Sequence, residues 1–376
     1  ARFSNDCTDF KSAPCAGAAA PTQLQPAHTF VRHSMKAAIA ASYGKAADVV
    51  SVVDSWPRPT LAGKQKLLVR VQACSISPGD KHCLSGGIRA LIAPKSFPYV
   101  VGMDVCGVVE QADAGAGFSV GDVVVASNGM EPWGGMAEIM AVMPSEAALK
   151  PEGLDAVTAA SCSSALAAIK AVEAAGVKAG SRVLVLGGSG GVGTAAVQLC
   201  KDAGASLVVT TSSQAALMAS LGADRVINYH SENWWALDEF RAERFDAIID
   251  CVGGGEHWSR STDVLKARGD GGCFVAVATD DPNPAMTSFW RVLYPVLQPL
   301  VGRPLWSLLA RKPYYRMVLT DSCSAAKAKV LSLVADGRLK IVLDAASPFP
   351  FTEEGVKAAF ALVESGRAHG KVSVKM

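Results

Sequence analysis

Residues 185–193 read Val-Leu-Gly-Gly-Ser-Gly-Gly-Val-Gly, and this stretch decides the fold because it sets the spacing G-x-G-x-x-G between a strand pattern and a helix pattern. Residues 182–186 form an apolar run typical of a buried strand, and a helical pattern follows the glycines to about residue 203. A pyrophosphate can bind at such a junction, because glycine lets the backbone approach it and the helix N-terminus offers free N–H groups. The predicted cofactor-binding loop consists of Gly188, Ser189, Gly190, Gly191, Val192 and Gly193.

The three spaced glycines of this loop have different expected tasks. We expect Gly188 to permit the tight turn, Gly190 to let the backbone approach the pyrophosphate, and Gly193 to let the helix pack closely on the strand. The alternative is a glycine-rich turn that binds nothing, and the strand-to-helix context argues against it.

Strand and helix patterns alternate after the glycine loop, which predicts an α/β fold with a doubly wound parallel sheet. An Ala-rich helix is expected before the first strand, over residues 156–175. We assign residues 159–318 to this nucleotide-binding domain. The further expected strands are 207–210, 225–227, 247–250 and 273–277.

The sequence on both sides of this domain predicts a second, β-rich domain. Residues 35–158 contain short apolar runs separated by Gly and Pro, which is typical of a β-rich fold. Residues 319–376 are too long for a linker and too short for a third domain, so we assign them back to the first one, making it discontinuous. The expected elements of this tail are helices over 325–336 and 353–365 and strands over 340–343 and 371–374.

Composition excludes several classes of protein. Half of the 376 residues are apolar and the net charge is only +2, so no strong field exists to attract nucleic acid. The ten cysteines contain no C-x-x-C pair, which argues against a zinc ribbon or a disulfide framework. The histidines have no matched cysteine or carboxylate spacing and are interpreted as surface or core residues; among them are His257 and His369.

Two further segments have open interpretations. Residues 289–310 are strongly apolar, but Arg and Pro interrupt them, so a transmembrane helix is not expected; a lid, a dimer-interface element and a segment lying on a membrane surface remain alternatives. Residues 1–34 are predicted to be an N-terminal extension. Their Ala, Pro, Ser and Thr content suggests the remnant of an organelle-targeting segment, although Asp6 and Asp9 argue for an ordinary tail.

The choice between the two nicotinamide dinucleotides is read about 20 residues beyond the glycine loop. An NAD-dependent enzyme would place a carboxylate there, whereas residues 210–214 read Thr-Thr-Ser-Ser-Gln. Hydroxyl groups can accept a 2′-phosphate that a carboxylate would repel, so Ser212 and Ser213 favour NADPH as the cofactor. Both serines can also cap the following helix, and the two roles are compatible.

Several motifs together resemble the medium-chain dehydrogenase/reductase family across nearly all of residues 35–376. They are Ser-Pro-Gly-Asp at 77–80, the Pro-Tyr-Val-Val-Gly-Met-Asp segment starting at 98, Val-Gly-Asp-Val-Val at 120–124 and the glycine loop. Within the family, the chain is most similar to zinc-free quinone oxidoreductases, and in particular to the mitochondrial reticulon-4-interacting protein branch. Residues 250–254 and 366–371 support this placement.

The resemblance implies a GroES-like catalytic domain, a Rossmann domain for NADPH, and an active site in the cleft between them. It implies that Tyr229 approaches the adenosine 2′-phosphate, although the basic residue often found just after the serines is missing. It also implies that Cys251 and Val252 lie close to the nicotinamide.

No catalytic or structural zinc is expected. Zinc-dependent members of the family place a Cys and a His where this chain has Ser77 and Met103, and a hydroxyl and a thioether do not make a catalytic zinc site. Ser77 is expected to hydrogen-bond the acceptor and Asp80 to order the loop; the alternative is that both only shape a turn.

The resulting prediction is a zinc-independent, NADPH-dependent oxidoreductase that transfers a hydride to a small-molecule quinone or another conjugated acceptor. The alternatives are an enoyl or enal reductase and a cofactor-binding accessory subunit of an organellar membrane complex. A homodimer and a peripheral membrane association are compatible with the sequence. An organellar location is expected, with the mitochondrion favoured over the chloroplast.

Overall fold

The structure is a computed structural model that describes residues 34–128, 134–281, 283–320 and 322–376. The extension predicted over residues 1–34 therefore lies, except for Ser34, outside the described residues.

The glycine loop belongs to a six-stranded sheet in which every neighbouring pair is parallel. The strand order β11-β10-β9-β12-β13-β14 is that of a Rossmann fold, with the first strand in the middle and the chain winding outward in both directions. The doubly wound parallel sheet predicted from the sequence is thus confirmed. Its strands are β9 (Arg182–Leu186), β10 (Leu207–Thr211), β11 (Arg225–Ile227), β12 (Ala247–Asp250), β13 (Cys273–Ala276) and β14 (Tyr314–Met317).

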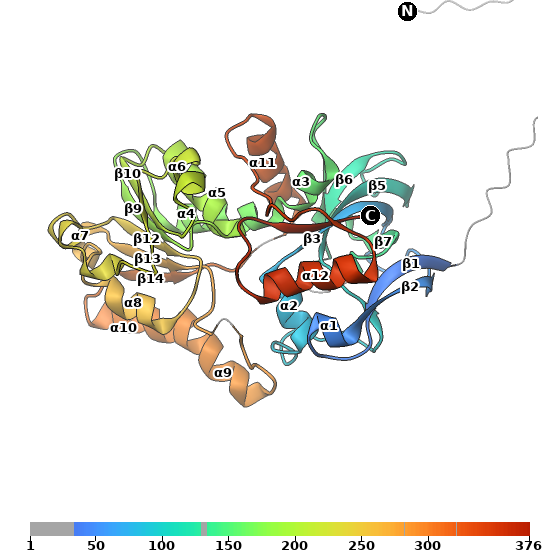
Figure 1. Cartoon of the computed structure of the whole chain (residues 1–376), viewed down its shortest axis with the longest axis horizontal. Coiled ribbons are helices and arrows are strands. Elements are labelled where there is room, and N and C mark those ends of the chain that lie inside the picture. The colour runs from blue at the N-terminus through green and yellow to red at the C-terminus, as the bar shows by residue number, and fades with distance from the viewer. Residues whose placement is uncertain (1–33, 129–133, 282, 321) are drawn as a thin grey trace, which may run out of the picture. The chain divides into compact units, whose positions relative to one another are not determined.

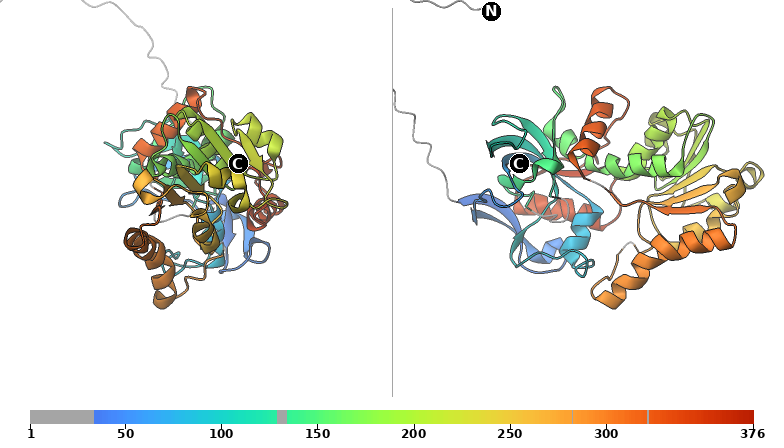
Figure 2. Two further views of the ribbon diagram at one scale, coloured as in Figure 1. Left: turned by 90° about the vertical axis from the view of Figure 1, so that its left-hand side faces the viewer. Right: turned by 180° about the vertical axis from the view of Figure 1, so that it is seen from behind.

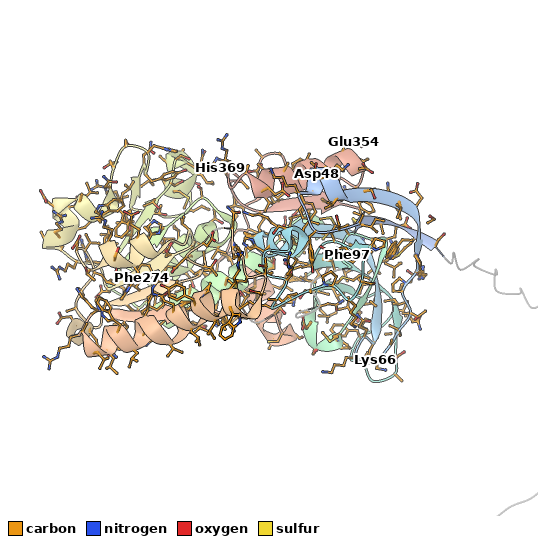
Figure 3. The ribbon with its side chains drawn as sticks, turned by 90° about the horizontal axis from the view of Figure 1, so that it is seen from below. Asp48, Lys66, Phe97, Phe274, Glu354 and His369 are labelled. Atoms are coloured by element: carbon orange, nitrogen blue, oxygen red, sulfur yellow. The ribbon has the colours of Figure 1, made fainter. Side chains whose placement is uncertain are left out.

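Helices cover both faces of this sheet (Figures 1 and 2). On one face, helices α4 and α5 pack together over small apolar residues of β9 and β12. On the other face, Trp234 and Trp258, the latter from α8, belong to one apolar cluster with Phe274 of β13, which Figure 3 labels. The helices of this domain are α4 (Ser163–Ala175), α5 (Gly191–Asp202), α6 (Ala215–Ser220), α7 (Asp238–Ala242) and α8 (Gly255–Ser261), with short 3₁₀ turns at Trp234–Ala236 (η2) and Arg268–Asp270 (η3).

The remaining strands form two antiparallel-rich sheets. One has the order β15-β16-β3-β5-β6-β8, with β7 also paired to β3, and the other has the order β2-β1-β4. These strands are β1 (Ser34–Ala40), β2 (Val50–Pro57), β3 (Leu67–Ile76), β4 (Tyr99–Val100), β5 (Asp104–Ala112), β6 (Val123–Ala126), β7 (Ile139–Val142), β8 (Ala147–Leu149), β15 (Phe349–Pro350) and β16 (Val372–Lys375).

The C-terminal segment returns to the sheet built by the N-terminal half. Strand β16 pairs antiparallel with β3, and helix α12 packs on β16. The exact domain boundaries proposed from the sequence stay a prediction. The accompanying helices are α1 (Ala46–Val49), α2 (Pro78–Ser85), α3 (Ala156–Ala160), α11 (Ser324–Ala335) and α12 (Glu353–Glu364), with a 3₁₀ turn at Pro144–Glu146 (η1).

Two local expectations were wrong, and one strand was missed. The strand predicted over 340–343 is absent, because this segment meets the chain near Lys371 through an isolated bridge from Leu343 and does not join a sheet ladder. The helix predicted over 156–175 is two helices, since Ser161 between α3 and α4 bonds back to the carbonyl oxygen of Val157 and to the hydroxyl of Ser373. Strand β14, whose Tyr-Tyr-Arg-Met sequence lacks a strand pattern, was not predicted.

The apolar segment predicted over 289–310 is helical. Helix α9 (Phe289–Leu297) continues through a π-helical turn, η4 (Gln298–Gly302), into α10 (Arg303–Leu309). Figure 1 shows α10 and α9, in orange, following one another beneath the parallel sheet. Among the described residues, no helix is both long enough and apolar enough to span a membrane.

Candidate active site and cofactor-binding site

The glycine loop joins β9 to α5, and two of its glycines are required by packing. A Cβ atom on Gly193 would lie 2.2 Å from the carbonyl oxygen of Gly187, so only glycine lets α5 begin this close to the strand. A Cβ atom on Gly188 would lie 2.0 Å from the hydroxyl oxygen of Thr210 on β10. The tight turn expected at Gly188 is instead made by Gly187, whose φ is +77°; Gly188 serves close packing.

The tip of the loop is open. Gly190 is the N-cap residue of α5, and a Cβ atom there would meet nothing closer than 3.6 Å. Ser189, Gly190, Gly191 and Val192 are half-buried, whereas Gly188 and Gly193 are buried. The first N–H groups of a helix have no partner within it, so the start of α5 can bind an anion. The geometry therefore fits the pyrophosphate of a dinucleotide.

The predicted 2′-phosphate residues lie together at the carboxyl edge of the sheet. Thr211 of β10 is paired with Ile227 of β11, so the residues that follow each strand are neighbours. Ser212 is buried, and its hydroxyl oxygen accepts the N–H of Gln214 at 2.9 Å. Gln214 is itself the N-cap residue of α6 (Ala215–Ser220) and no side chain caps that helix, so the expectation that the serines cap it is wrong. Ser213 is exposed, and the ring of Tyr229 is 55% exposed, so a ligand can reach both.

The predicted nicotinamide-side residues follow β12. The N–H of Cys251 donates to the carbonyl oxygen of Leu186, which places Cys251 beside the start of the glycine loop. One carboxylate oxygen of Asp250 accepts the N–H groups of Val252 and Gly253, each at 3.0 Å, and so shapes the turn. Burial, and next the charge of Asp250, raise the pKa of the Cys251 thiol well above its usual range, which disfavours a reactive thiolate.

His257 also belongs to this turn, contrary to the expectation of a histidine without a carboxylate partner. Its Nδ1 lies 3.2 Å from the second carboxylate oxygen of Asp250. Burial alone lowers the pKa of His257, but the hydrogen bond to Asp250 and the negative charges of Asp250 and Glu256 outweigh it, and the net pKa is raised. The sequence carried no signal for this pair, because its spacing matched no known motif.

Ser77 and Asp80 lie at the start of α2 and contact one another directly. One carboxylate oxygen of Asp80 accepts both the N–H and the hydroxyl of Ser77, each at 2.8 Å. Asp80 is 4% exposed, and its other oxygen has no hydrogen-bond partner among the described residues. Burial, and next the negative charge of Asp104, raise the pKa of Asp80 to about 7. Asp80 is thus able to exchange a proton near neutral pH.

Lys371 connects the start of α2 with the glycine loop, and sequence reasoning gave it no role. Its ammonium donates to the carbonyl oxygen of Ile76 at 3.2 Å, and it is only 5% exposed. Its aliphatic stem passes the loop, 3.0 Å from the position of a Cβ atom on Gly191. A lysine 180 positions away from the loop has no local sequence pattern that would reveal this contact.

The residues just before Lys371 also contact the glycine loop and the predicted 2′-phosphate residues. The N–H of Gly370 donates to the carbonyl oxygen of Ser189 at 2.8 Å. The Nε2 atom of His369, a residue labelled in Figure 3, lies 3.2 Å from the Nε2 atom of Gln214. His369, interpreted from the sequence as a surface or core residue, therefore lies next to the predicted 2′-phosphate residues. Only the motif at 366–371 indicated that this segment matters.

The two positions at which zinc-dependent enzymes carry ligands face each other in this chain. Both the side chain of Met103 and the hydroxyl of Ser77 lie within 4 Å of the position of a Cβ atom on Gly79. Cys162 is buried, its thiol donates to the carbonyl oxygen of Thr158, and burial raises its pKa to about 12. Within the described ranges, no three His, Cys, Asp or Glu side chains gather as metal ligands.

Comparison with known proteins places this fold and these loops in a family. Residues 63–152 match the family model described as alcohol dehydrogenase GroES-like domain, and residues 221–374 match the one described as zinc-binding dehydrogenase. The 2-methylene-furan-3-one reductase of Solanum lycopersicum is 33% identical over 351 residues, covering 90% of this chain and 79% of the relative. The chain belongs to the medium-chain dehydrogenase/reductase superfamily.

Two further relatives locate the chain within the superfamily. The protein named NAD(P)H oxidoreductase RTN4IP1, mitochondrial, of Homo sapiens is 31% identical to this chain. The match covers 91% of this chain and 89% of that protein. The solved structure of the quinone oxidoreductase from Coxiella burnetii has a TM-score of 0.72 and 28% identity, covering 91% of this chain and 99% of that one. The family resemblance and the α/β fold predicted from the sequence are confirmed.

Proposed function

We propose that this medium-chain dehydrogenase/reductase is a zinc-independent, NADPH-dependent oxidoreductase that transfers a hydride to a quinone-like acceptor. One observation carries the proposal: Lys371 connects the glycine loop to the start of α2, where the buried Asp80 contacts the hydroxyl of Ser77 and has a pKa raised to about 7. The names of its relatives, which include quinone oxidoreductases and NAD(P)H oxidoreductases, support the same reaction class.

NADPH is proposed over NADH because no carboxylate follows β10, where a 2′-phosphate would lie. The exposed hydroxyls of Ser213 and Tyr229 can contact that phosphate. His369, next to Gln214, brings an imidazole ring with hydrogen-bonding nitrogens to the same edge, where the sequence lacks a basic residue. One relative, from Arabidopsis thaliana, is named an NADPH-dependent alkenal/one oxidoreductase.

Zinc independence rests on the side chains that occupy the ligand positions. Ser77 and Met103 offer a hydroxyl and a thioether, which are not the thiolate and imidazole ligands that hold a catalytic zinc. The family description as a zinc-binding dehydrogenase is therefore not carried over to this chain.

In the proposed mechanism the bound cofactor supplies the hydride, and the protein positions the acceptor and supplies a proton. When Asp80 is protonated, its O–H can donate to the Ser77 oxygen across the same 2.8 Å contact, and the Ser77 hydroxyl turns its own hydrogen to an acceptor oxygen. The proton lost by Asp80 and the hydride together complete the reduction. The pKa of Asp80 near 7 permits this transfer. Lys371 positions Ser77 by binding the carbonyl oxygen of the residue before it.

The first test is titration with NADPH and NADH, followed by side-by-side oxidation assays with quinones and enoyl thioesters. We expect tighter binding of NADPH, and quinone-dependent turnover that a metal chelator leaves unchanged. Failure to bind either nucleotide would reject the enzyme proposal. Loss of turnover after chelation, reversed by added zinc, would reject the zinc-independent mechanism.

Replacing Ser213 by aspartate tests the proposed 2′-phosphate site. We expect Ser213→Asp to weaken NADPH binding about tenfold and to change NADH binding much less, because the carboxylate repels only the phosphorylated ribose. Ser213→Asn is the matched control, since it adds similar volume without charge. Equal weakening of both nucleotides by Ser213→Asp would show that the 2′-phosphate binds elsewhere.

Reduction of a conjugated enal or enoyl group is the second candidate function. The tomato relative named 2-methylene-furan-3-one reductase and the Arabidopsis relative named alkenal/one oxidoreductase favour it. Faster turnover of enals than of quinones would select it. Absence of turnover with every acceptor, together with co-purification in a large complex, would instead select the accessory-subunit alternative.

An organellar location is part of the proposal, with the mitochondrion favoured. Relatives with mitochondrial names and relatives with chloroplast names both support an organellar location. Unimpaired organelle import after deletion of the encoded residues upstream of Met35 would count against a targeting role for that segment.

A further inference from the structure

Helices α9 and α10 and the turn between them expose one continuous line of large apolar side chains, which we call the apolar stripe. Trp290 is 77% exposed and Tyr294 is 73% exposed, and the other members recur at helical spacing along the same face. Trp306 and Leu309 are exposed beside it. The stripe consists of Trp290, Leu293, Tyr294, Leu297, Val301, Leu305 and Leu308.

Helix α10 has its polar face turned toward the protein. Arg303 is 7% exposed, and its guanidinium binds both carboxylate oxygens of Asp280, at 2.8 and 2.6 Å, and the hydroxyl of Tyr315 at 3.0 Å. Ser307, one turn later, is fully buried and accepts a hydrogen bond from Arg268 at 3.2 Å. These bonds fix the orientation of the helix, so the apolar side chains cannot turn inward without breaking the bonds of the buried Arg303 guanidinium and of the buried Ser307 hydroxyl.

The unpaired charge of the segment that carries the stripe is positive. Residues 282–320 contain five Arg and Lys residues and no Asp or Glu; Asp280 and Asp281 border the segment, and Asp280 is paired with one of the five, Arg303. Arg291 and Arg311 are exposed and Lys312 is half-buried, next to the Trp306 ring. Apolar side chains, Trp and Tyr rings and neighbouring cations together match the apolar boundary and the anionic headgroups of a lipid bilayer.

We propose that α9 and α10 dock on an anionic lipid surface, lying parallel to it with the apolar stripe in the headgroup boundary. A second copy of the chain is a poorer occupant, because a two-fold contact through this face would bring its cations together. The segment that enters α9 contacts the loop after α2, where the N–H of Ala90 donates to the carbonyl oxygen of Met286 at 3.1 Å. Docking thus brings the lipid surface near the helix that begins with Ser77.

The test is flotation of the full chain with vesicles of phosphatidylcholine alone or of phosphatidylcholine with cardiolipin. We expect binding to the cardiolipin vesicles, which added salt weakens, and little binding to the neutral ones. The double variant Leu297→Ser and Leu308→Ser should bind at least about tenfold more weakly, since two exposed leucines no longer enter the lipid. Val120→Ser with Leu149→Ser, which removes two exposed apolar side chains elsewhere, should bind like the wild type.

Two further controls test whether the variant is folded and whether charge contributes to lipid binding. Unchanged NADPH binding by the leucine variant shows that the protein is folded, and Arg311→Glu with Lys312→Glu should weaken binding without removing an apolar side chain. Equal flotation of the stripe variant and the wild type would overturn the proposal. The proposal would also be overturned if neither protein bound lipid and the wild type were a dimer that the stripe variant converts to a monomer. Flotation is measured without an acceptor, so its outcome is independent of the proposed reductase activity.

Discussion

Gly193→Ala is expected to abolish nucleotide binding and to destabilise the protein. The new methyl group would lie 2.2 Å from the carbonyl oxygen of Gly187 and 2.7 Å from the Cα atom of Gly188, and neither backbone atom can move without shifting α5 away from β9. Overpacking of this kind costs about 1–3 kcal/mol. We expect NADPH affinity to fall by about a hundredfold or more, as measured by fluorescence titration, with a lower unfolding midpoint in urea.

Gly190→Ala is the matched comparison, because we expect substitutions at Gly190 and Gly193 to weaken nucleotide binding for different reasons. A methyl group on Gly190 would contact nothing closer than 3.6 Å, so the free energy of unfolding should change by less than about 1 kcal/mol. The methyl group nevertheless occupies the side on which the pyrophosphate approaches, so nucleotide affinity should still fall. Wild-type NADPH affinity in both variants would reject the assignment of this loop.

Asp80→Asn is expected to change the pH dependence of stability. Because the folded-state pKa of Asp80 is raised to about 7, the folded protein binds more protons than the unfolded chain between about pH 4 and pH 7. The contribution of Asp80 to stability therefore becomes less favourable as pH rises through this window and stays constant above it. For the wild type this amounts to a loss of about 2 kcal/mol between pH 5 and pH 8, which the asparagine variant should not show.

Urea unfolding at pH 5 and pH 8 measures this difference. Asp54→Asn, which removes an exposed carboxylate on β2, is the control and should keep the wild-type pH dependence. The same Asp80→Asn variant should lower quinone turnover by about a hundredfold while NADPH binding stays normal, because an amide still accepts from Ser77 but cannot supply a proton. An unchanged pH dependence together with unchanged turnover would reject the role of Asp80.

Local patterns in the sequence were sufficient for the fold class and for placing the glycine loop between a strand and a helix. Alternating strand and helix patterns require a parallel sheet with crossovers, and the glycine spacing reports a backbone geometry that does not depend on distant residues. The site at Ser77 and Asp80 could be predicted only in part from such local patterns. The sequence placed both residues at a turn after a strand, but it predicted neither the start of helix α2 nor their contact there. The raised pKa of Asp80 depends on burial and on Asp104, which a turn motif does not reveal.

Features that depend on distant contacts were decided by the tertiary structure alone. Lys371 reaches both Ile76 and the glycine loop because β16 returns to β3, and His257 meets Asp250 because α8 folds back over the end of β12. The outward direction of the apolar stripe was likewise open in the sequence, since an apolar helix is usually buried. The ion pair of Arg303 with Asp280 settles that direction, because burying the polar face of α10 leaves its apolar face exposed.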